Sequence, residues 1–476
     1  MEDGLALLHY RRSRFGWEGF RMLWRAPWIQ ERFALVGLAL WDLISMAVSY
    51  KFVYWRRLGD WPGLTGSLLF LLLVWIGASY LFGRYSARPI KGWRESKFLR
   101  LGLIVVLVLS IFVFHSWFFV ITDAGTRFRG FLIPLLAMAS ILSITGQMLV
   151  RRRGRMVPNW LLVLADHERL LLQKELKCSF LHSSSMPSFL SPEEFESLLL
   201  QSEKISEDWV DLTLAISSQV DLNGDAVERL LALRGQGLQI HSLVGWCEIV
   251  LHRVPPELID QRWFIDAEGF SIQPGRLAWR VKRLFDVFGA LLLIVLTSPL
   301  MILLMFSIRI EDGGPIFYSQ IRTGLYGEKI KIWKFRSMRE NAESDGIQWA
   351  SKNDVRITRL GGLIRRLRLD ELPQLFAVLS GELSLIGPRP ERPELELELV
   401  TQLPHYRIRH WIRPGLSGWA QVNYPYGASV SDSRIKLSFD LFYIRNAGFF
   451  LDLFILLRTM RLVLKAEGSQ PISTSS

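Results

Sequence analysis

The sequence predicts a mainly α-helical membrane protein that also contains a small parallel α/β domain and a third, helical domain rich in charged residues. Three observations predict this fold class. Half of the 476 residues are hydrophobic, including 18 Trp and 29 Phe, which exceeds the composition of an ordinary soluble protein. Four long apolar stretches come first in the chain, and apolar strands that alternate with helices follow them. The chain is also too long for one hydrophobic core.

The first domain, residues 1–155, is predicted to be a four-helix transmembrane bundle. Each apolar stretch is close to the ~20 residues that a helix needs to cross ~30 Å of hydrocarbon. The predicted spans are residues 33–54, 65–83, 101–122 and 131–150.

The distribution of arginine and lysine predicts the orientation of these spans. Basic residues are frequent before the first span, between the second and third, and after the fourth, while the opposite loops hold fewer. By the positive-inside rule, the N-terminus, the second loop and everything after residue 150 lie in the cytoplasm. The net charge of +12 comes largely from residues that flank apolar runs, so we expect a membrane surface and no nucleic acid as the partner of this charge.

Residues 156–270 are predicted to form a Rossmann-like parallel α/β domain. Apolar strands around 160–165, 210–216 and 238–244 alternate with helical segments. A dinucleotide site would need a glycine-rich turn after the first strand, but Asp166 and Glu168 stand there, and acids at a helix start repel a pyrophosphate. We therefore expect a regulatory or packing role for this domain.

An apolar run at residues 284–308 opens the third domain, which we place at residues 276–470 before a disordered tail at 471–476. By its length the run could be a fifth span. Ser298 and Pro299 interrupt it, and proline removes a backbone hydrogen bond and kinks a helix. Basic residues also stand on both sides of it. A re-entrant helix hairpin keeps both ends cytoplasmic, with the Ser298 hydroxyl able to bond a freed carbonyl; a kinked fifth span is the alternative.

Two adjacent acids, Asp370 and Glu371, follow a basic segment and precede the rigid sequence Gly387-Pro388-Arg389-Pro390. Adjacent helical side chains point ~100° apart, so the two carboxylates can have different roles. One can hold a divalent cation while the other faces a phosphorus atom. Arg389 suits a phosphate group. Lys334 and Arg336 share a face if their segment is extended. The simpler interpretation makes each acid a salt-bridge partner of nearby arginines.

Short motifs recur in order along residues 282–468, and together they are specific although each alone is weak. They are Lys-Arg-x-x-Asp (Lys282, Arg283, Asp286), Ser298-Pro299, Gly314-Pro315-Ile316-Phe317, Gln320-x-Arg322-x-Gly324, Lys334-Phe335-Arg336-Ser337-Met338, Asp354-x-Arg356-x-Thr358, residues 369–375, residues 387–390 and residues 413–421. With these motifs the region resembles the bacterial sugar transferases known as polyprenyl-phosphate phosphoglycosyl transferases, of the monotopic superfamily. The spans and the α/β insert resemble the large members that initiate exopolysaccharide or O-antigen repeat units.

The resemblance implies a mechanism and a set of site residues. Asp370 matches the nucleophile that attacks the sugar-bearing phosphorus of a UDP-sugar, releases UMP and forms a phosphosugar-aspartate intermediate, which undecaprenyl phosphate then takes up. Glu371 matches the Mg²⁺ ligand and Arg389 the phosphate-binding arginine. The further site cations and orienting groups are Lys334, Arg336, Asp354, Arg356 and Arg368. The implied location is the cytoplasmic face of the bacterial inner membrane, in a multi-pass protein.

Departures from the family pattern and open alternatives remain at this point. Leu367 and Arg368 stand where Thr-Ser is frequent, Ala377 replaces a common Asn, and Tyr424 a common Gly; these bear on the choice of donor sugar, which the sequence leaves open. A homodimer through the spans or the α/β domain is expected as one oligomeric form. The competing functions are a glycosyltransferase that releases UDP and an inactive membrane scaffold for a polysaccharide assembly complex.

Overall fold

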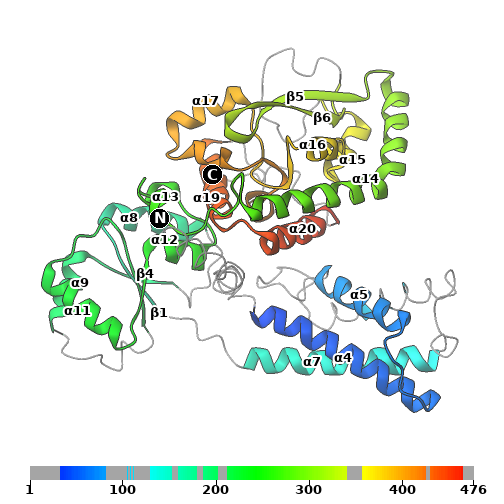
Figure 1. Ribbon diagram of the computed structural model, residues 1–476, viewed down its shortest axis with the longest axis horizontal. Helices are drawn as coiled ribbons and strands as arrows, with labels where there is room; N and C mark the ends of the chain where they lie inside the picture. Colours follow the sequence, from blue (N-terminus) through cyan, green and yellow to red (C-terminus); the bar gives the residue numbers. More distant parts are fainter. Residues whose placement is uncertain are drawn as a thin grey trace, which may run out of the picture. The chain divides into compact units, whose positions relative to one another are not determined.

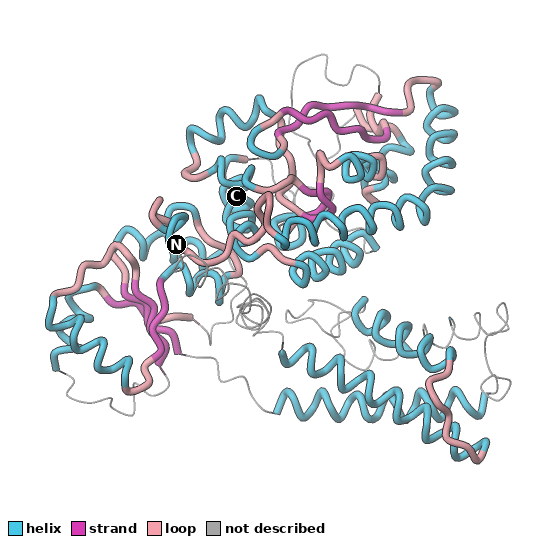
Figure 2. The backbone as a smooth tube through the Cα atoms, in the orientation of Figure 1, coloured by secondary structure: helices cyan, strands magenta, loops and turns pink. Residues whose placement is uncertain are grey.

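The structure is a computed structural model, and it describes residues 33–81, 104–105, 108, 111, 129–152, 159–178, 186–201, 212–339, 356–424 and 429–464. The chain divides into two compact units, Met1–Val157 and Pro158–Ser476. Figure 1 shows the elements of both units, and Figure 2 shows that helices dominate them. The predicted tail at 471–476 and most of the predicted span at 101–122 lie outside the described residues.

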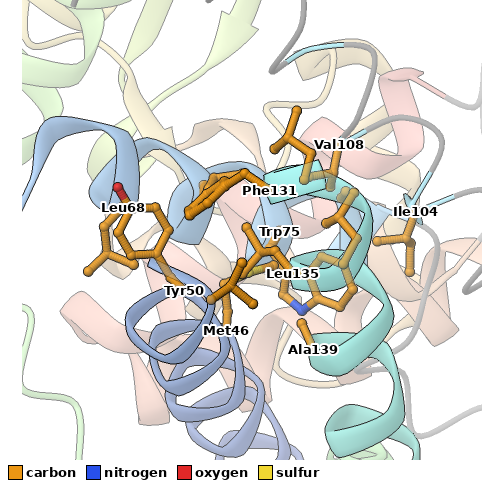
Figure 3. Close-up of a cluster of buried hydrophobic side chains, with 14 residues drawn as sticks. Met46, Tyr50, Leu68, Trp75, Ile104, Val108, Phe131, Leu135 and Ala139 are labelled. Atoms are coloured by element: carbon orange, nitrogen blue, oxygen red, sulfur yellow. The ribbon is translucent and has the colours of Figure 1, made fainter. Parts of the chain in front are cut away.

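Three of the four predicted spans are helices in the described part of the first unit. They are α4 (Phe33–Leu58), α5 (Gly66–Leu81) and α7 (Arg129–Arg152). Figure 3 shows their shared core, in which Met46, Trp75 and Phe131 are fully buried. Ile104 and Val108, from the predicted third span, belong to the same core.

One helix of this unit, Val36–Arg57, is long and apolar enough to cross a membrane, and the apolar parts of α5 and α7 (Gly66–Tyr80 and Phe131–Gly146) are shorter. The unit is therefore helical and apolar as predicted. The count of four spans stays a prediction.

The second unit begins with the predicted parallel α/β fold. Its four-stranded sheet has the order β2-β1-β3-β4, and all neighbours are parallel. The strands are β1 (Asn159–Val163), β2 (Ser188–Leu190), β3 (Leu212–Ile216) and β4 (Gln239–Ser242). The helices are α8 (Asp166–Cys178), α9 (Pro192–Gln201), α11 (Gly224–Gly235) and α12 (Leu243–Trp246), which continues as a π-helical turn, Cys247–Leu251. Helices α9 and α11 cover one face of the sheet, and α8 and α12 cover the other.

The start of α8, where a related fold would bind a phosphate, is occupied by a side chain of the helix itself. Glu168 is buried, and its carboxylate accepts hydrogen bonds from the Ala165 backbone N–H (3.2 Å) and the Ser217 hydroxyl (2.6 Å). A second anion at this helix terminus would meet a carboxylate that already neutralises the helix dipole. The packing or regulatory role of the domain stays a prediction.

The apolar run at the entrance to the third domain forms one long helix, α14 (Leu277–Asp312), which starts earlier and ends later than predicted. It is apolar enough to cross a membrane. Figure 1 shows that α14 changes direction sharply before it reaches β5. Pro299 lies inside the helix, so the carbonyl of Val295 lacks its normal N–H donor. The Ser298 hydroxyl donates to that carbonyl (3.0 Å), as predicted.

The first half of α14 is fastened to the rest of the unit by the Lys-Arg-x-x-Asp motif. The Arg283 guanidinium donates to the carbonyls of Val378 (2.5 Å) and Leu379 (2.6 Å), at the end of helix α16 (Gln374–Ser380). Lys282 Nζ donates to the Ile386 carbonyl (3.0 Å) and to Asp452 (2.7 Å). Ile386 ends β7 (Ser384–Ile386), and Asp452 lies in α20 (Phe449–Leu464).

Asp286 completes this attachment, and its loss should be costly. It is buried, and it accepts hydrogen bonds from the Ser384 hydroxyl (2.8 Å) and the Leu385 N–H (3.0 Å). Asp286→Ala leaves these donors unsatisfied, so we expect a loss of about 2–3 kcal/mol in the free energy of unfolding. Asp286→Asn should lose less, because its carbonyl oxygen can still accept. Thermal unfolding of both variants in detergent measures the difference; equal losses would contradict this explanation.

The remaining described elements of the unit are two short sheets, further helices and four 3₁₀ turns. Strands β5 (Phe317–Thr323) and β6 (Lys329–Phe335) form an antiparallel hairpin, and β7 pairs in parallel with β8 (Gly415–Ser417). The helices are α13 (Trp263–Asp266), α15 (Arg359–Arg366), α17 (Pro393–Gln402), α18 (Trp419–Asn423) and α19 (Val430–Asn446). Short 3₁₀ turns lie at Pro256–Leu258, Leu325–Gly327, Leu369–Glu371 and Tyr406–Trp411 (η8).

Helix α19 joins the α/β part to the third domain. Its Arg434 donates to Glu257 (2.5 Å) and Glu175 (2.6 Å), and its Arg445 pairs with Glu248. The Val254 N–H donates to the Ser438 carbonyl (2.9 Å). The predicted sheet domain is thus attached to α19 through buried and half-buried ion pairs.

Candidate active site

The two adjacent acids lie on a single 3₁₀ turn between α15 and α16. The Thr358 side chain caps the start of α15 by accepting from the Gly361 N–H (2.9 Å). After α15 the backbone of Arg368 adopts the left-handed region (φ 55°), which non-glycine residues enter at some cost. This left-handed residue separates α15 from the turn Leu369–Glu371, and Pro373 then precedes α16. A strained residue two positions before a pair of acids is typical of a functional site.

Glu371 lies among three cations from three parts of the chain. Its Oε1 accepts from Arg389 Nη2 (2.7 Å) and from Lys334 Nζ (3.3 Å), and its Oε2 lies 3.9 Å from Arg368 Nη1. The residue is buried. Burial alone would raise the pKa of Glu371, but the three cations outweigh it and hold the pKa well below its usual range. Glu371 is therefore ionised at every physiological pH.

Asp370 has the opposite environment. Across the described parts of the chain, its carboxylate has no hydrogen bond or ion pair. Burial and the neighbouring Glu371 charge raise its pKa, while Lys334, Arg365 and Arg389 oppose that rise. Neighbouring carboxylates whose pKa values are shifted apart are characteristic of sites in which each acid has its own role. Asp370 is the more basic of the two and so the better nucleophile.

Arg389 is presented by a loop whose backbone is held at several points. Gly387 packs directly against the backbone of Gly415, where a Cβ atom would collide. The Gly387 N–H donates to the Ser417 carbonyl (2.8 Å), and the Gly415 N–H donates to the Pro388 carbonyl (2.8 Å). The close approach of the two backbones explains why glycine stands at Gly387 in the motif 387–390 and at Gly415 in the motif 413–421.

The structure brings together only part of the predicted site. The Glu371 carboxylate is surrounded by Lys334, Arg368 and Arg389. Asp370 is the residue next to Glu371 in the sequence. Arg336 instead pairs with Asp312 at the end of α14, so the two cations of the Lys334 motif contact different carboxylates. The Arg356 carbonyl accepts from the Arg339 N–H (2.8 Å). Asp354 lies outside the described residues.

Two cations near the site were not among the predicted residues. Arg365 acts electrostatically on Asp370 from the last turn of α15. Arg322 donates to the Pro390 carbonyl (3.2 Å). Both belong to sequences singled out above, the basic segment before the acids and the Gln-x-Arg-x-Gly motif. Only the tertiary structure shows that they face Asp370 and the Arg389 loop.

The donor set suits a magnesium ion that arrives with a diphosphate. Among the described residues there is no group of three His, Cys, Asp or Glu side chains that could hold a metal ion by itself. Mg²⁺ is commonly bound by one or two carboxylates together with substrate phosphates and water. Glu371 Oε2 lies beyond hydrogen-bond distance of Arg368, and Asp370 is adjacent. The two acids therefore fit such an ion.

The lowered pKa of Glu371 predicts how stability depends on pH. Because the pKa is lower in the folded than in the unfolded state, the stabilisation is fully present above its ordinary value of 4.5 and is lost as pH falls below it. Glu371→Gln lacks this titration. We expect the difference in unfolding temperature between wild type and Glu371→Gln to shrink as pH falls from 7 to 3. A difference that stays constant over this range would contradict the assignment.

The site is a cluster of cations around two acids, on a domain that also carries a long apolar helix, and its positive charge suits phosphate groups. The family model for bacterial sugar transferase matches residues 277–466. An uncharacterized sugar transferase, EpsL of Bacillus subtilis, is 41% identical over 194 residues, which cover 40% of this chain and 90% of that protein. The chain belongs to the bacterial sugar transferase family.

Two further relatives carry more specific names. The UDP-N-acetylgalactosamine-undecaprenyl-phosphate N-acetylgalactosaminephosphotransferase of Aeromonas hydrophila is 43% identical over 200 residues, 42% of this chain and 47% of that protein. The UDP-glucose:undecaprenyl-phosphate glucose-1-phosphate transferase of Klebsiella pneumoniae is 36% identical over 181 residues, 38% of this chain and 39% of that protein. The match thus spans less than half the length of these two relatives.

Proposed function

We propose that this protein transfers a sugar 1-phosphate from a UDP-sugar to undecaprenyl phosphate, releasing UMP and forming undecaprenyl-diphospho-sugar. The names of the relatives support the reaction class. The observation that carries the proposal is the contrast between two adjacent acids: Glu371 is paired with cations, and the half-buried Asp370 beside it has a raised pKa. If the acids served only as ion-pair partners of the cations, Glu371 would be sufficient and Asp370 would not be needed.

In the first step an Asp370 carboxylate oxygen attacks the sugar-bearing phosphorus of the donor. A bond forms between that oxygen and phosphorus, and the bond from phosphorus to the bridging oxygen breaks. UMP leaves with the electron pair, and Lys334, Arg368 and Arg389 stabilise the charge on the phosphate oxygens. When bound, Mg²⁺ would supply further charge neutralisation at the diphosphate, held by Glu371.

In the second step a phosphate oxygen of undecaprenyl phosphate attacks the same phosphorus. The bond to Asp370 breaks, the carboxylate is restored and the diphospho-sugar leaves. Splitting the transfer into two displacements lets one site serve two phosphate substrates in turn.

The bend of α14 supports a placement of this chemistry on the cytoplasmic membrane surface. The helix bends, Pro299 lies inside it, and large apolar side chains such as Phe288, Leu296 and Phe306 are exposed along it. A re-entrant course through one leaflet would bury them in lipid and keep both Lys282 and the site on the basic, cytoplasmic side. A multi-pass arrangement of the first unit belongs to the same proposal.

Nucleotide release from a panel of UDP-sugars tests the function. Purified protein is incubated with Mg²⁺, undecaprenyl phosphate and each donor, and the released nucleotide is identified. UMP with one donor supports the proposal and names the sugar. UDP would indicate a glycosyltransferase that moves the sugar alone, and no release across the panel would favour the inactive scaffold.

A further inference from the structure

The loop that presents Arg389 has few backbone groups by which it can be held. Pro388 and Pro390 have no N–H, so the three-residue segment offers one N–H and three carbonyls. The carbonyls of Pro388 and Pro390 accept from the Gly415 N–H (2.8 Å) and from Arg322 Nη1 (3.2 Å). The middle carbonyl, that of Arg389 itself, accepts from Arg409 Nη2 at 2.9 Å. Arg409 is thus a side chain that binds the backbone of the phosphate arginine itself.

Arg409 is itself fixed by groups from other elements. It lies in η8, is 5% exposed, and its Nη2 also donates to Asp440 Oδ2 of α19 at 3.0 Å. Its Nη1 donates to the Tyr406 hydroxyl (2.5 Å). A buried, planar guanidinium with this many partners has one position available to it. Through Arg409, contacts with α19 and η8 therefore fix the position of the Arg389 backbone.

We propose that Arg409 is a positioning residue: through the Arg389 carbonyl it holds the backbone from which the Arg389 guanidinium reaches Glu371 and the donor phosphates. The effect on the reaction rests on the proposed function, but the effect on the loop does not. Lysine at 409 keeps the charge beside Asp440 but has one ammonium group in place of the planar fork. It cannot satisfy the Asp440 carboxylate, the Tyr406 hydroxyl and the Arg389 carbonyl with the same geometry.

Hydrogen exchange tests the positioning without any substrate. The Arg409→Lys variant of the full chain is compared with wild type at the backbone amides of residues 387–392. We expect exchange there to accelerate roughly fivefold, the equivalent of one lost hydrogen bond. Arg253→Lys is the matched control, because Arg253 is also 5% exposed and ion-paired, to Glu175, but contacts α8 and Phe439 and not this loop. Unchanged exchange in Arg409→Lys would overturn the proposal.

A double-mutant cycle tests the link to the reaction. Arg409→Lys alone is expected to lower kcat/KM for UMP release about 100-fold, as misplacement of a substrate-orienting group does. In an Arg389→Ala background the same change should cost less than about threefold, because the group that it positions is already absent. Equal losses in both backgrounds would show that Arg409 acts on the fold in general and would overturn the proposal.

Two outcomes keep the proposed function and this inference apart. If wild type releases no nucleotide from any donor, the proposed function fails, and the exchange measurement still decides the positioning. If Arg409→Lys does not fold, Arg409→Met with Asp440→Leu takes its place, since replacing both members of a buried ion pair is better tolerated than removing one. Faster exchange confined to residues 387–392 supports the proposal in either variant.

Discussion

Asp370→Asn is expected to abolish UMP release, with a loss of at least about a thousandfold in kcat. Asparagine is nearly the same size and keeps one oxygen, but its amide oxygen is a poor nucleophile. The local fold around this half-buried residue should therefore remain intact while the chemistry stops. The exposed Asp260 provides a control, because Asp260→Asn removes a carboxylate of the same unit far from the cation cluster in the sequence and should leave UMP release unchanged.

A labelling experiment makes this prediction specific for the covalent intermediate. Wild type is incubated with a UDP-sugar labelled at its sugar-bearing phosphate, without undecaprenyl phosphate, and the protein is separated from free nucleotide. Label should remain on wild type and on Asp260→Asn, and be absent from Asp370→Asn. Release of one UMP for each labelled protein would complete the balance. Label on Asp370→Asn would show that another residue is the nucleophile.

Glu371→Gln is expected to have the second largest effect, about a thousandfold loss of kcat that added Mg²⁺ does not restore. Glutamine removes the negative charge that Lys334, Arg368 and Arg389 face, so the three cations repel one another and lose their common position. The proposed metal contact is lost in the same substitution.

Glu371→Asp separates these two roles. Aspartate keeps the charge but is shorter, so we expect part of the activity to return at a higher Mg²⁺ concentration than wild type needs. Thermal unfolding of both variants shows whether the protein is folded when activity is measured. If Glu371→Gln keeps more than a tenth of wild-type activity with an unchanged Mg²⁺ requirement, Glu371 is only a salt-bridge partner of the arginines.

The parts of this structure that repeat with a regular period were predictable from the sequence. The apolar helices of the first unit and the parallel sheet of the α/β part each follow from local residue patterns. The adjacent acids and Arg389 were also evident, because a carboxylate pair among cations and a Pro-Arg-Pro sequence are unusual locally. The earlier start of α14 was not, since Lys282, which precedes the predicted run, contacts β7 and α20.

Contacts between distant segments account for what sequence reasoning missed. Arg336 resembles Lys334 in the sequence, yet Arg336 turns to Asp312 while Lys334 turns to Glu371. Arg409 stands in an ordinary basic stretch, and its bond to the Arg389 carbonyl joins residues 20 positions apart. No periodicity or spacing indicates which of many arginines is buried against which acceptor. These choices are made by packing in the folded chain.

Helix α19 has a consequence for how this chain can be rearranged by recombination. Relatives such as EpsL match most of their length to only 40% of this chain, which makes the sheet domain look like a removable module. In this protein, however, the segment before α14 is bound to α19 and η8: the Phe270 N–H donates to the Arg445 carbonyl (3.0 Å), and His405 lies 3.2 Å from the Ile259 carbonyl. A gene exchange that joined a foreign domain at residue 276 would strip Arg434 and Arg445 of their carboxylates. We expect a functional chimera to keep residues 248–272 together with the transferase domain. The boundary for domain exchange therefore lies within the predicted α/β domain and not at its end.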